Sequence, residues 1–184
     1  MKENSRCPWA KDPLEILYHD TEWCIPEHDD QKLFEMLILE GMQAGLSWSL
    51  ILKRREHMQI AFDGFNPDKI SAYTHEKIEQ LMLDPEIIRN RRKLEAMVSN
   101  AKAFLAIQQE FGSFDKYIWS FTHGETIDNK LQSIEDFPAS SPLSEKVSKD
   151  LKKRGFKFVG PVIIYSYLQA IGIVNDHLLS CPFH

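Results

Sequence analysis

Four residues near the two ends of the chain carry the side chains of a metal site. Cys7 and His19 lie near the start, and His177 and Cys181 lie four positions apart near the end. Two thiols and two imidazoles are a donor set of closed, four-coordinate zinc sites, which leave no position for a water molecule. Such a site would be structural and would tie the two termini together. The alternative is that these are buried thiols and core histidines without a metal.

A carboxylate falls on the apolar face of a predicted helix. Residues 30–44 repeat apolar side chains with the period of a helix, in which successive residues advance by about 100°. On this helix Glu40 lies near the middle of the apolar stripe that contains Leu33 and Leu37. An unpaired buried carboxylate is strongly unfavourable, so Glu40 must be paired or must face a cavity. The alternative is an ordinary glutamate on a solvated face.

Aromatic residues could form the walls of such a cavity. A turn at residues 44–48 returns Trp48 toward the end of the helix that carries Glu40, and Tyr18, Trp23 and Trp9 could supply further walls. A carboxylate among aromatic rings suits the recognition of a flat, electron-poor ring. Each aromatic residue taken singly is more often a core residue.

Residues 155–161 connect two predicted helices, and the segment starts at Gly155 and ends with Gly160 and Pro161. The first helix ends in basic residues, and the second begins after Gly160, where a backbone can approach closely. The free N–H groups at a helix N-terminus suit a phosphate oxygen, and Lys157 adds a positive charge nearby. This pattern is typical of a helix-hairpin-helix that clamps a DNA backbone. The alternative is an ordinary pair of helices whose basic last turn favours the helix dipole.

The elements that position these residues are predicted to be helices. Capping residues, prolines and glycines delimit helices at residues 30–44, 47–62, 74–84, 85–111, 113–121, 141–154 and 160–173, and a further short helix begins at residues 66–67. Residues 123–141 are predicted to form one long loop, and no pair of strands joined by a hairpin turn is expected. The fold class is therefore all-α, built from many short helices in a single domain of residues 1–184.

Composition narrows the class of protein. The chain has 184 residues, 43% of them hydrophobic, and a formal net charge of -5. Basic residues nevertheless cluster at positions 53–55, 89–93 and 149–157, which is typical of either solvated helix faces or a polyanion-binding face. No apolar run reaches the roughly 18 residues of a membrane span, and the start of the chain does not resemble a signal peptide. We expect a cytoplasmic monomer without a disulfide framework.

Taken together, these segments resemble the 3-methyladenine DNA glycosylase I family of the helix-hairpin-helix superfamily. The resemblance spans nearly the whole chain. It is carried by DPL at 12–14, YHD at 18–20, EW at 22–23, KLFE at 32–35, LEG at 39–41, QAGLSW at 43–48, KKRGFKFVG at 152–160 and VNDH at 174–177. Other members of the superfamily often carry a catalytic aspartate where this chain has Asn175.

The resemblance implies a repair enzyme that flips 3-methyladenine out of double-stranded alkylated DNA and hydrolyses it from the sugar without cleaving the strand. It implies a zinc ion on the two cysteines and two histidines, and a pocket lined by Glu40, Tyr18 and Trp48, with Trp9 and Trp23 nearby. Leu46 would lie near the gap left in the duplex. Whether Glu40 recognises the base or catalyses its release stays open. The alternatives are a non-catalytic binder of alkylated DNA and a zinc hydrolase.

Overall fold

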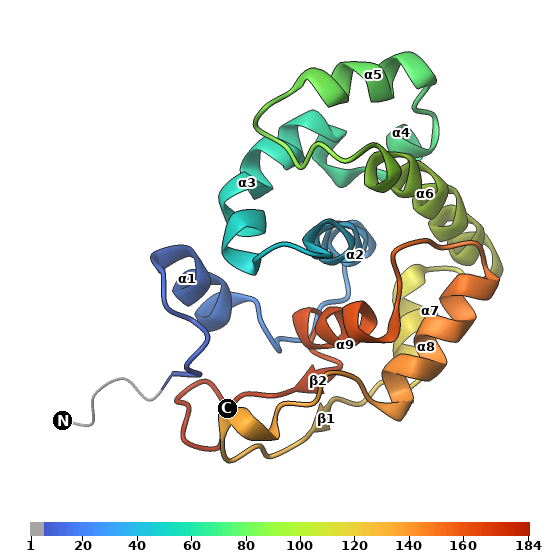
Figure 1. The fold of residues 1–184 in the computed structure, drawn as a ribbon. Coiled ribbons are helices and arrows are strands. Elements are labelled where there is room, and N and C mark those ends of the chain that lie inside the picture. The colour runs from blue at the N-terminus through green and yellow to red at the C-terminus, as the bar shows by residue number, and fades with distance from the viewer. Residues whose placement is uncertain (1–5) are drawn as a thin grey trace.

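The computed structural model describes residues 6–184 and is mostly helical in that range. None of the helices in this part of the chain is long and apolar enough to span a membrane. Two short 3-10 turns lie at Asp63–Phe65 and Ile134–Asp136. The α-helices (Figure 1) are α1 (Pro13–Thr21), α2 (Asp30–Gln43), α3 (Trp48–Ala61), α4 (Pro67–Ser71), α5 (His75–Leu83), α6 (Arg91–Phe111), α7 (Phe114–Ser120), α8 (Pro142–Lys153) and α9 (Pro161–Ala170).

Helix α2 forms the centre of the molecule. Every residue from 33 to 42 is buried, as expected for a helix that is covered on all sides. It packs against α3, α6, α7 and α9, and Figure 1 shows it end-on between these helices. Because α2 carries Glu40, the fold places this carboxylate in the interior.

Local capping explains why the helices begin where the sequence predicts. The side chain of Asp29 accepts a hydrogen bond from the backbone N–H of Lys32 at the start of α2, and Ser47 accepts one from Leu50 at the start of α3. These bonds satisfy N–H groups that have no partner inside the helix. Between the two helices Gly45 has a φ of 79°, which other residues adopt with strain, so the predicted stop after residue 44 is confirmed.

Two predicted boundaries differ from the structure. Helix α1 was not among the predicted helices, although Asp12 and Glu15 form a capping box at its start. Helix α6 begins at Arg91, capped by Asn90, and not at residue 85 as the sequence pattern predicts. A proline suits a first helical turn, but it equally suits the turn that the structure has at this point.

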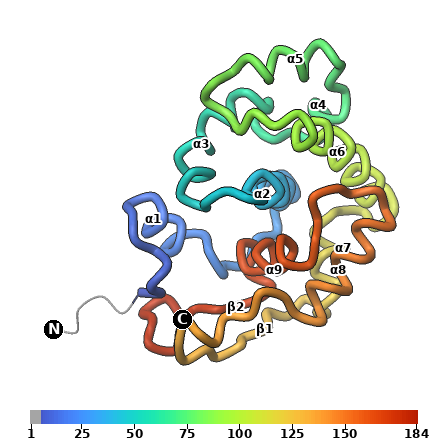
Figure 2. Tube along the Cα trace, viewed as in Figure 1, coloured from blue at the N-terminus to red at the C-terminus, as the bar shows by residue number. Residues whose placement is uncertain are grey.

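The predicted loop at 123–141 also contains a short strand. Strand β1 (Ile127–Asp128) pairs in parallel with β2 (Val174–Asn175), which is distant in sequence, so the pair is not a hairpin and the sequence does not predict it. Two-residue strands carry no alternating pattern that a sequence could reveal. The pairing fixes the loop beside the C-terminal segment, which runs back to the beginning of the described chain (Figure 2).

Candidate functional site

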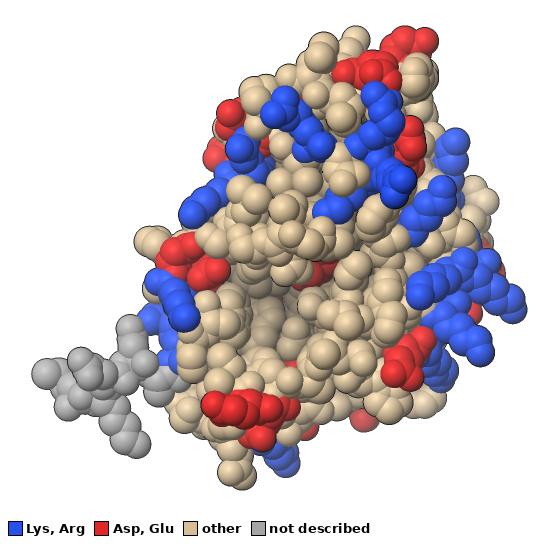
Figure 3. Space-filling view, viewed as in Figure 1, with Lys and Arg blue, Asp and Glu red and all other residues tan. Residues whose placement is uncertain are grey.

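A pocket opens between α1, α2, α3 and α9. Its volume is about 290 Å³, which accommodates a small aromatic ring, and Figure 3 shows a hollow at this place on the surface. The residues that line it are Trp9, Tyr18, Trp23, Glu40, Gln43, Trp48, Ile134, Phe137, Ser166 and Gln169. The structure therefore brings together the glutamate and the four aromatic residues that the sequence predicts as a pocket.

Glu40 is the carboxylic acid among the residues that line this pocket. Its side chain is 4% exposed, and its Oε2 atom is buried with no hydrogen-bond partner among the described residues. Burial raises the pKa of Glu40 to about 8, because an ionised carboxylate loses hydration there without gaining a counter-charge. The site is therefore suited to a ligand that brings hydrogen-bond donors or positive charge.

The aromatic side chains meet one another at steep angles around the pocket. The ring centroids of Tyr18 and Trp48 are 5.1 Å apart, and those of Trp9 and Trp23 are 4.9 Å apart in an edge-to-face arrangement. The indole Nε1 atoms of Trp9 and Trp48 are buried and lack hydrogen-bond partners within residues 6–184. The pocket thus combines aromatic surface with two unused donors and one unused acceptor.

Five pocket residues were missed by the sequence analysis. Gln43 lies three positions after Glu40 on α2, and Ser166 and Gln169 have the same spacing on α9, so helical periodicity could have indicated them as neighbours. Ile134 and Phe137 come from the loop before α8. No local pattern indicates where that loop lies.

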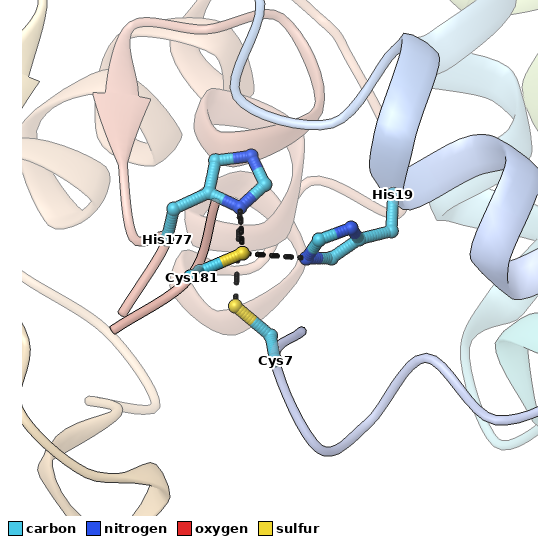
Figure 4. A group of neighbouring side chains, drawn as sticks. All are labelled: Cys7, His19, His177 and Cys181. Atoms are coloured by element: carbon cyan, nitrogen blue, oxygen red, sulfur yellow. Dashed lines mark hydrogen bonds between the residues drawn. The ribbon is translucent and has the colours of Figure 1, made fainter. Parts of the chain in front are cut away.

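The predicted metal ligands also converge. The ligand atoms of Cys7, His19, His177 and Cys181 all lie within 4.8 Å of one another and all four side chains are buried (Figure 4). Cys181 Sγ is 3.6 Å from His19 Nε2 and 3.6 Å from His177 Nδ1. Tetrahedral zinc with its usual bond lengths would place a sulfur and a nitrogen ligand about 3.5 Å apart, so the donor set fits the ion.

The outer partners of the two histidines support the same fit. His19 Nδ1 lies 2.7 Å from a carboxylate oxygen of Asp20, and His177 Nε2 lies 3.2 Å from the carbonyl oxygen of Trp23. In each ring the second nitrogen is thereby left free to face the cluster. Such outer hydrogen bonds orient imidazoles that bind metals.

The cluster lies directly beside the pocket. Trp9 follows Cys7 by two residues, and Tyr18 precedes His19 by one. The ring of Trp9 is 5.4 Å from that of His19, centroid to centroid. An ion held by the cluster would therefore also hold two walls of the pocket in place.

Asp176 is fully buried, and its carboxylate has a structural environment. Its oxygens accept hydrogen bonds from Tyr165 (2.6 Å), Gln169 (2.7 Å) and Asn129 (2.7 Å). The backbone N–H of Asp176 donates to the sulfur of Cys24, so that cysteine packs, as expected, outside the metal cluster. The Asp176 carboxylate thus links α9 and the loop at Asn129 to the C-terminal segment.

The connection between α8 and α9 is the segment for which the sequence predicts a clamp. Gly155 and Phe158 have φ values of 96° and 56°, and Lys157 is exposed at the tip. Gly160 caps α9 without a side-chain bond, and a methyl group added there would have no neighbour within 4 Å among residues 6–184. Leu46 is 37% exposed in the turn between α2 and α3 and does not line the pocket.

The sequence matches the family model of methyladenine glycosylases over residues 9–184. It is 47% identical to DNA-3-methyladenine glycosylase 1 of Escherichia coli, over 96% of this chain and 95% of that protein. It is 46% identical to DNA-3-methyladenine glycosylase of Haemophilus influenzae, over 97% of each chain. The chain belongs to the methyladenine glycosylase family.

Solved structures of methyladenine glycosylases have the same fold. A crystal structure of a 3-methyladenine DNA glycosylase I matches with a TM-score of 0.95 and 49% identity, over 97% of this chain and 99% of that one. A variant of such an enzyme in complex with 3-methyladenine matches with a TM-score of 0.92 and 42% identity, over 94% and 93% of the two chains.

The basic clusters of this methyladenine glycosylase divide into structural and exposed residues. Arg54, Arg55, Arg91 and Arg154 form ion pairs with carboxylates of the protein, and Lys93 is buried. These five side chains contact other parts of the protein, so the free positive charge is smaller than the sequence clusters indicate. Lys and Arg side chains gather above the hollow and to its right in Figure 3. The exposed members of the clusters are Lys53, Arg89, Arg92, Lys149, Lys152, Lys153 and Lys157.

Proposed function

We propose that this chain is a DNA repair glycosylase that flips 3-methyladenine out of alkylated double-stranded DNA and hydrolyses its bond to deoxyribose. The observation that carries the proposal is the Glu40 carboxylate, buried and unpartnered in an aromatic pocket of ring size. Membership of the methyladenine glycosylase family supports the same activity.

The substrate needs little help to leave. Methylation at N3 gives the adenine ring a positive charge and weakens its bond to the sugar, so the base departs as a neutral molecule. Water attacks C1′ of the deoxyribose as the bond from C1′ to the base nitrogen breaks. The bonding electrons leave with the base and neutralise its ring, and the attacking water loses a proton to bulk water and remains as the C1′ hydroxyl. The protein must extrude the nucleotide, exclude normal bases and stabilise positive charge on the sugar, and flipping alone costs a few kcal/mol. A normal adenine lacks the positive charge that the pocket favours.

Glu40 has two compatible roles in this scheme. A cationic base beside it would oppose the effect of burial and return the pKa of Glu40 toward its ordinary value, so the carboxylate would ionise as the base enters. The ionised group would accept a hydrogen bond from the exocyclic amine and stabilise the positive charge that develops on the sugar. Tyr18 and Trp48 would border the ring, and Trp9 and Trp23 would close the pocket.

The surface around the pocket suits duplex DNA. The N-terminus of α9 at Gly160 leaves room for a phosphate oxygen, and Lys157 adds charge beside it, as in a helix-hairpin-helix clamp. Leu46, on the turn before α3, would fill the gap that the flipped nucleotide leaves in the stack. Monomeric state and cytoplasmic location stay predictions.

We assign one structural zinc ion to Cys7, His19, His177 and Cys181. The ion supplies a cross-link between the termini and no chemistry at the base, because four protein ligands leave no open position. Burial also lowers the pKa of His177 to about 4, so this imidazole is neutral and able to bind a metal. The role as a zinc hydrolase is therefore not proposed.

The proposal is tested by incubating the protein with methylated duplex DNA and measuring released bases by chromatography. We expect release of 3-methyladenine, no release of unmodified adenine and no strand cleavage until the abasic sites are treated with alkali. A protein that binds the methylated duplex yet releases no base in single-turnover conditions would instead be the non-catalytic binder.

A further inference from the structure

Two polar side chains lie on the buried face of α6, where apolar residues are expected. Lys93 and Asn100 are 7% and 5% exposed, and seven residues bring them to the same side of the helix. Both line a narrow crevice between α6, α2 and the connection to α9, together with Gly41 and Phe158. Burying a lysine and an asparagine is unfavourable unless their hydrogen bonds are satisfied, so their partners show what they do.

Lys93 binds the turn that carries Leu46. Its Nζ donates to the carbonyl oxygens of Met42 and Ala44, each at 2.7 Å. These carbonyls lie at the C-terminal end of α2, where carbonyls have no partner inside the helix and a positive charge is favourable. Within residues 6–184 no carboxylate pairs with this ammonium group. Its contacts are therefore with the backbone of residues 42–44, immediately before Leu46.

Asn100 binds the connection between α8 and α9. Its Nδ2 donates to the carbonyl oxygen of Lys157 at 3.0 Å, and its Oδ1 accepts from the backbone N–H of Lys157 at 2.8 Å. The two bonds fix both the position and the orientation of the backbone at Lys157. The next residue, Phe158, has a φ of 56° and packs against α2 at Gly41. A Cβ atom added to Gly41 would lie 3.5 Å from the Cβ atom of Phe158.

We infer that Lys93 and Asn100 are positioning residues that hold the wedge turn (residues 43–47) and the clamp loop (residues 155–160) at a fixed spacing for the same duplex. The two segments are far apart in sequence, and among the helices of residues 6–184 only α6 has side chains that bond to both backbones. A rise of 1.5 Å per residue separates the two attachment points by about 10 Å along the helix. This inference rests on the proposed function.

Preorganisation is the physical reason for such a device. A turn and a loop that were free to move would lose conformational entropy when DNA orders them, and that loss would weaken binding. Hydrogen bonds to backbone atoms fix orientation as well as distance, which apolar packing does not. Glu40 faces the pocket from the other side of α2, and of the residues in the two bonded segments Gln43 alone lines the pocket as described within residues 6–184. Loss of these bonds should therefore weaken binding of the duplex more than binding of the free base.

The test for Lys93 is a double-mutant cycle with Leu46. Lys93→Met keeps an unbranched side chain, shorter by one atom, and removes the charge. Lys102→Met removes a charge from the exposed face of the same helix as a control. Affinity is measured for a duplex that contains a tetrahydrofuran abasic site, and separately for free 3-methyladenine. We expect Lys93→Met to weaken duplex binding about tenfold, to weaken binding of the free base by a much smaller factor, and to add nothing in a Leu46→Ala background.

The test for Asn100 uses the salt dependence of binding. Lys157→Ala should reduce the magnitude of the slope of log affinity against log salt by about 1, and Asn100→Leu should reduce it by the same amount. The double variant should have the same slope as Lys157→Ala alone. Asn100→Asp, which keeps the acceptor and loses the donor, should have an intermediate effect and serves if Asn100→Leu folds poorly. Additive losses in both cycles, or equal weakening of free-base and duplex binding, would overturn the inference and leave the two residues purely structural. Because the duplex assay requires no base release, a protein that binds DNA but fails to excise 3-methyladenine would refute the proposed function separately.

Discussion

Replacement of Glu40 by glutamine should change the pH dependence of stability in a defined direction. Burial raises the pKa of Glu40 from 4.5 to about 8. Between these values the unfolded chain releases this proton and the folded chain keeps it, so the folded state binds more protons and its stability falls as the pH rises. The loss is absent below the lower value and complete above the higher one. At 1.36 kcal/mol per pKa unit, the full loss is about 5 kcal/mol.

The variant Glu40→Gln carries no ionisable group at this position and escapes that loss. Its free energy of unfolding relative to the wild type should rise by about 2 kcal/mol between pH 6 and pH 8. The measurements stay above pH 6 because at lower pH protons compete with zinc for the thiol and imidazole ligands of the metal site. Contributions of all other groups cancel in the difference.

The assay is urea denaturation of both proteins at several pH values, with zinc present throughout. Glu95→Gln, on the exposed face of α6, controls for the loss of one negative charge. A difference between Glu40→Gln and wild type that stays constant from pH 6 to pH 8 would refute the reasoning, because it would mean that the Glu40 carboxylate is well hydrated.

Three further substitutions test the surrounding structure. Cys181→Ser should abolish stoichiometric zinc binding and weaken binding of free 3-methyladenine, whereas Cys24→Ser should keep the metal; equal metal content in both variants would exclude the proposed ligand set. Gly172→Ala should lower the free energy of unfolding by about 3 kcal/mol or more, since φ is 73° and a Cβ would lie 2.3 Å from the backbone at Ile25, and a normal urea midpoint would contradict this geometry. Gly160→Ala should leave the urea midpoint unchanged but weaken binding to duplex DNA, and unchanged DNA affinity would place the phosphate elsewhere.

The chemistry of the site could be predicted from the sequence because its residue types are unusual in their positions. Glu40 interrupts an apolar stripe, and the structure places it in the pocket. The four Cys and His side chains form a known donor set, and they converge. Helix starts were predictable where a side chain caps the backbone, as Ser47 does for α3.

The remaining features depend on contacts between distant segments. Ile134 and Phe137 reach the pocket because β1 pairs with β2, and a two-residue strand has no sequence pattern. Lys93 lies within a run of basic residues that indicates a solvated face, yet it is buried because the end of α2 needs a donor. A charge run does not reveal which member points inward.

The rate of base release by Glu40→Gln tests the central claim most directly. Single-turnover excision of 3-methyladenine from duplex DNA is measured for the wild type and the variant, with zinc content and urea midpoints confirming that both are folded. We predict a decrease of at least about tenfold, equivalent to about 1.4 kcal/mol of transition-state stabilisation. Equal rates in the two proteins would contradict the claim that this buried carboxylate acts on the flipped base.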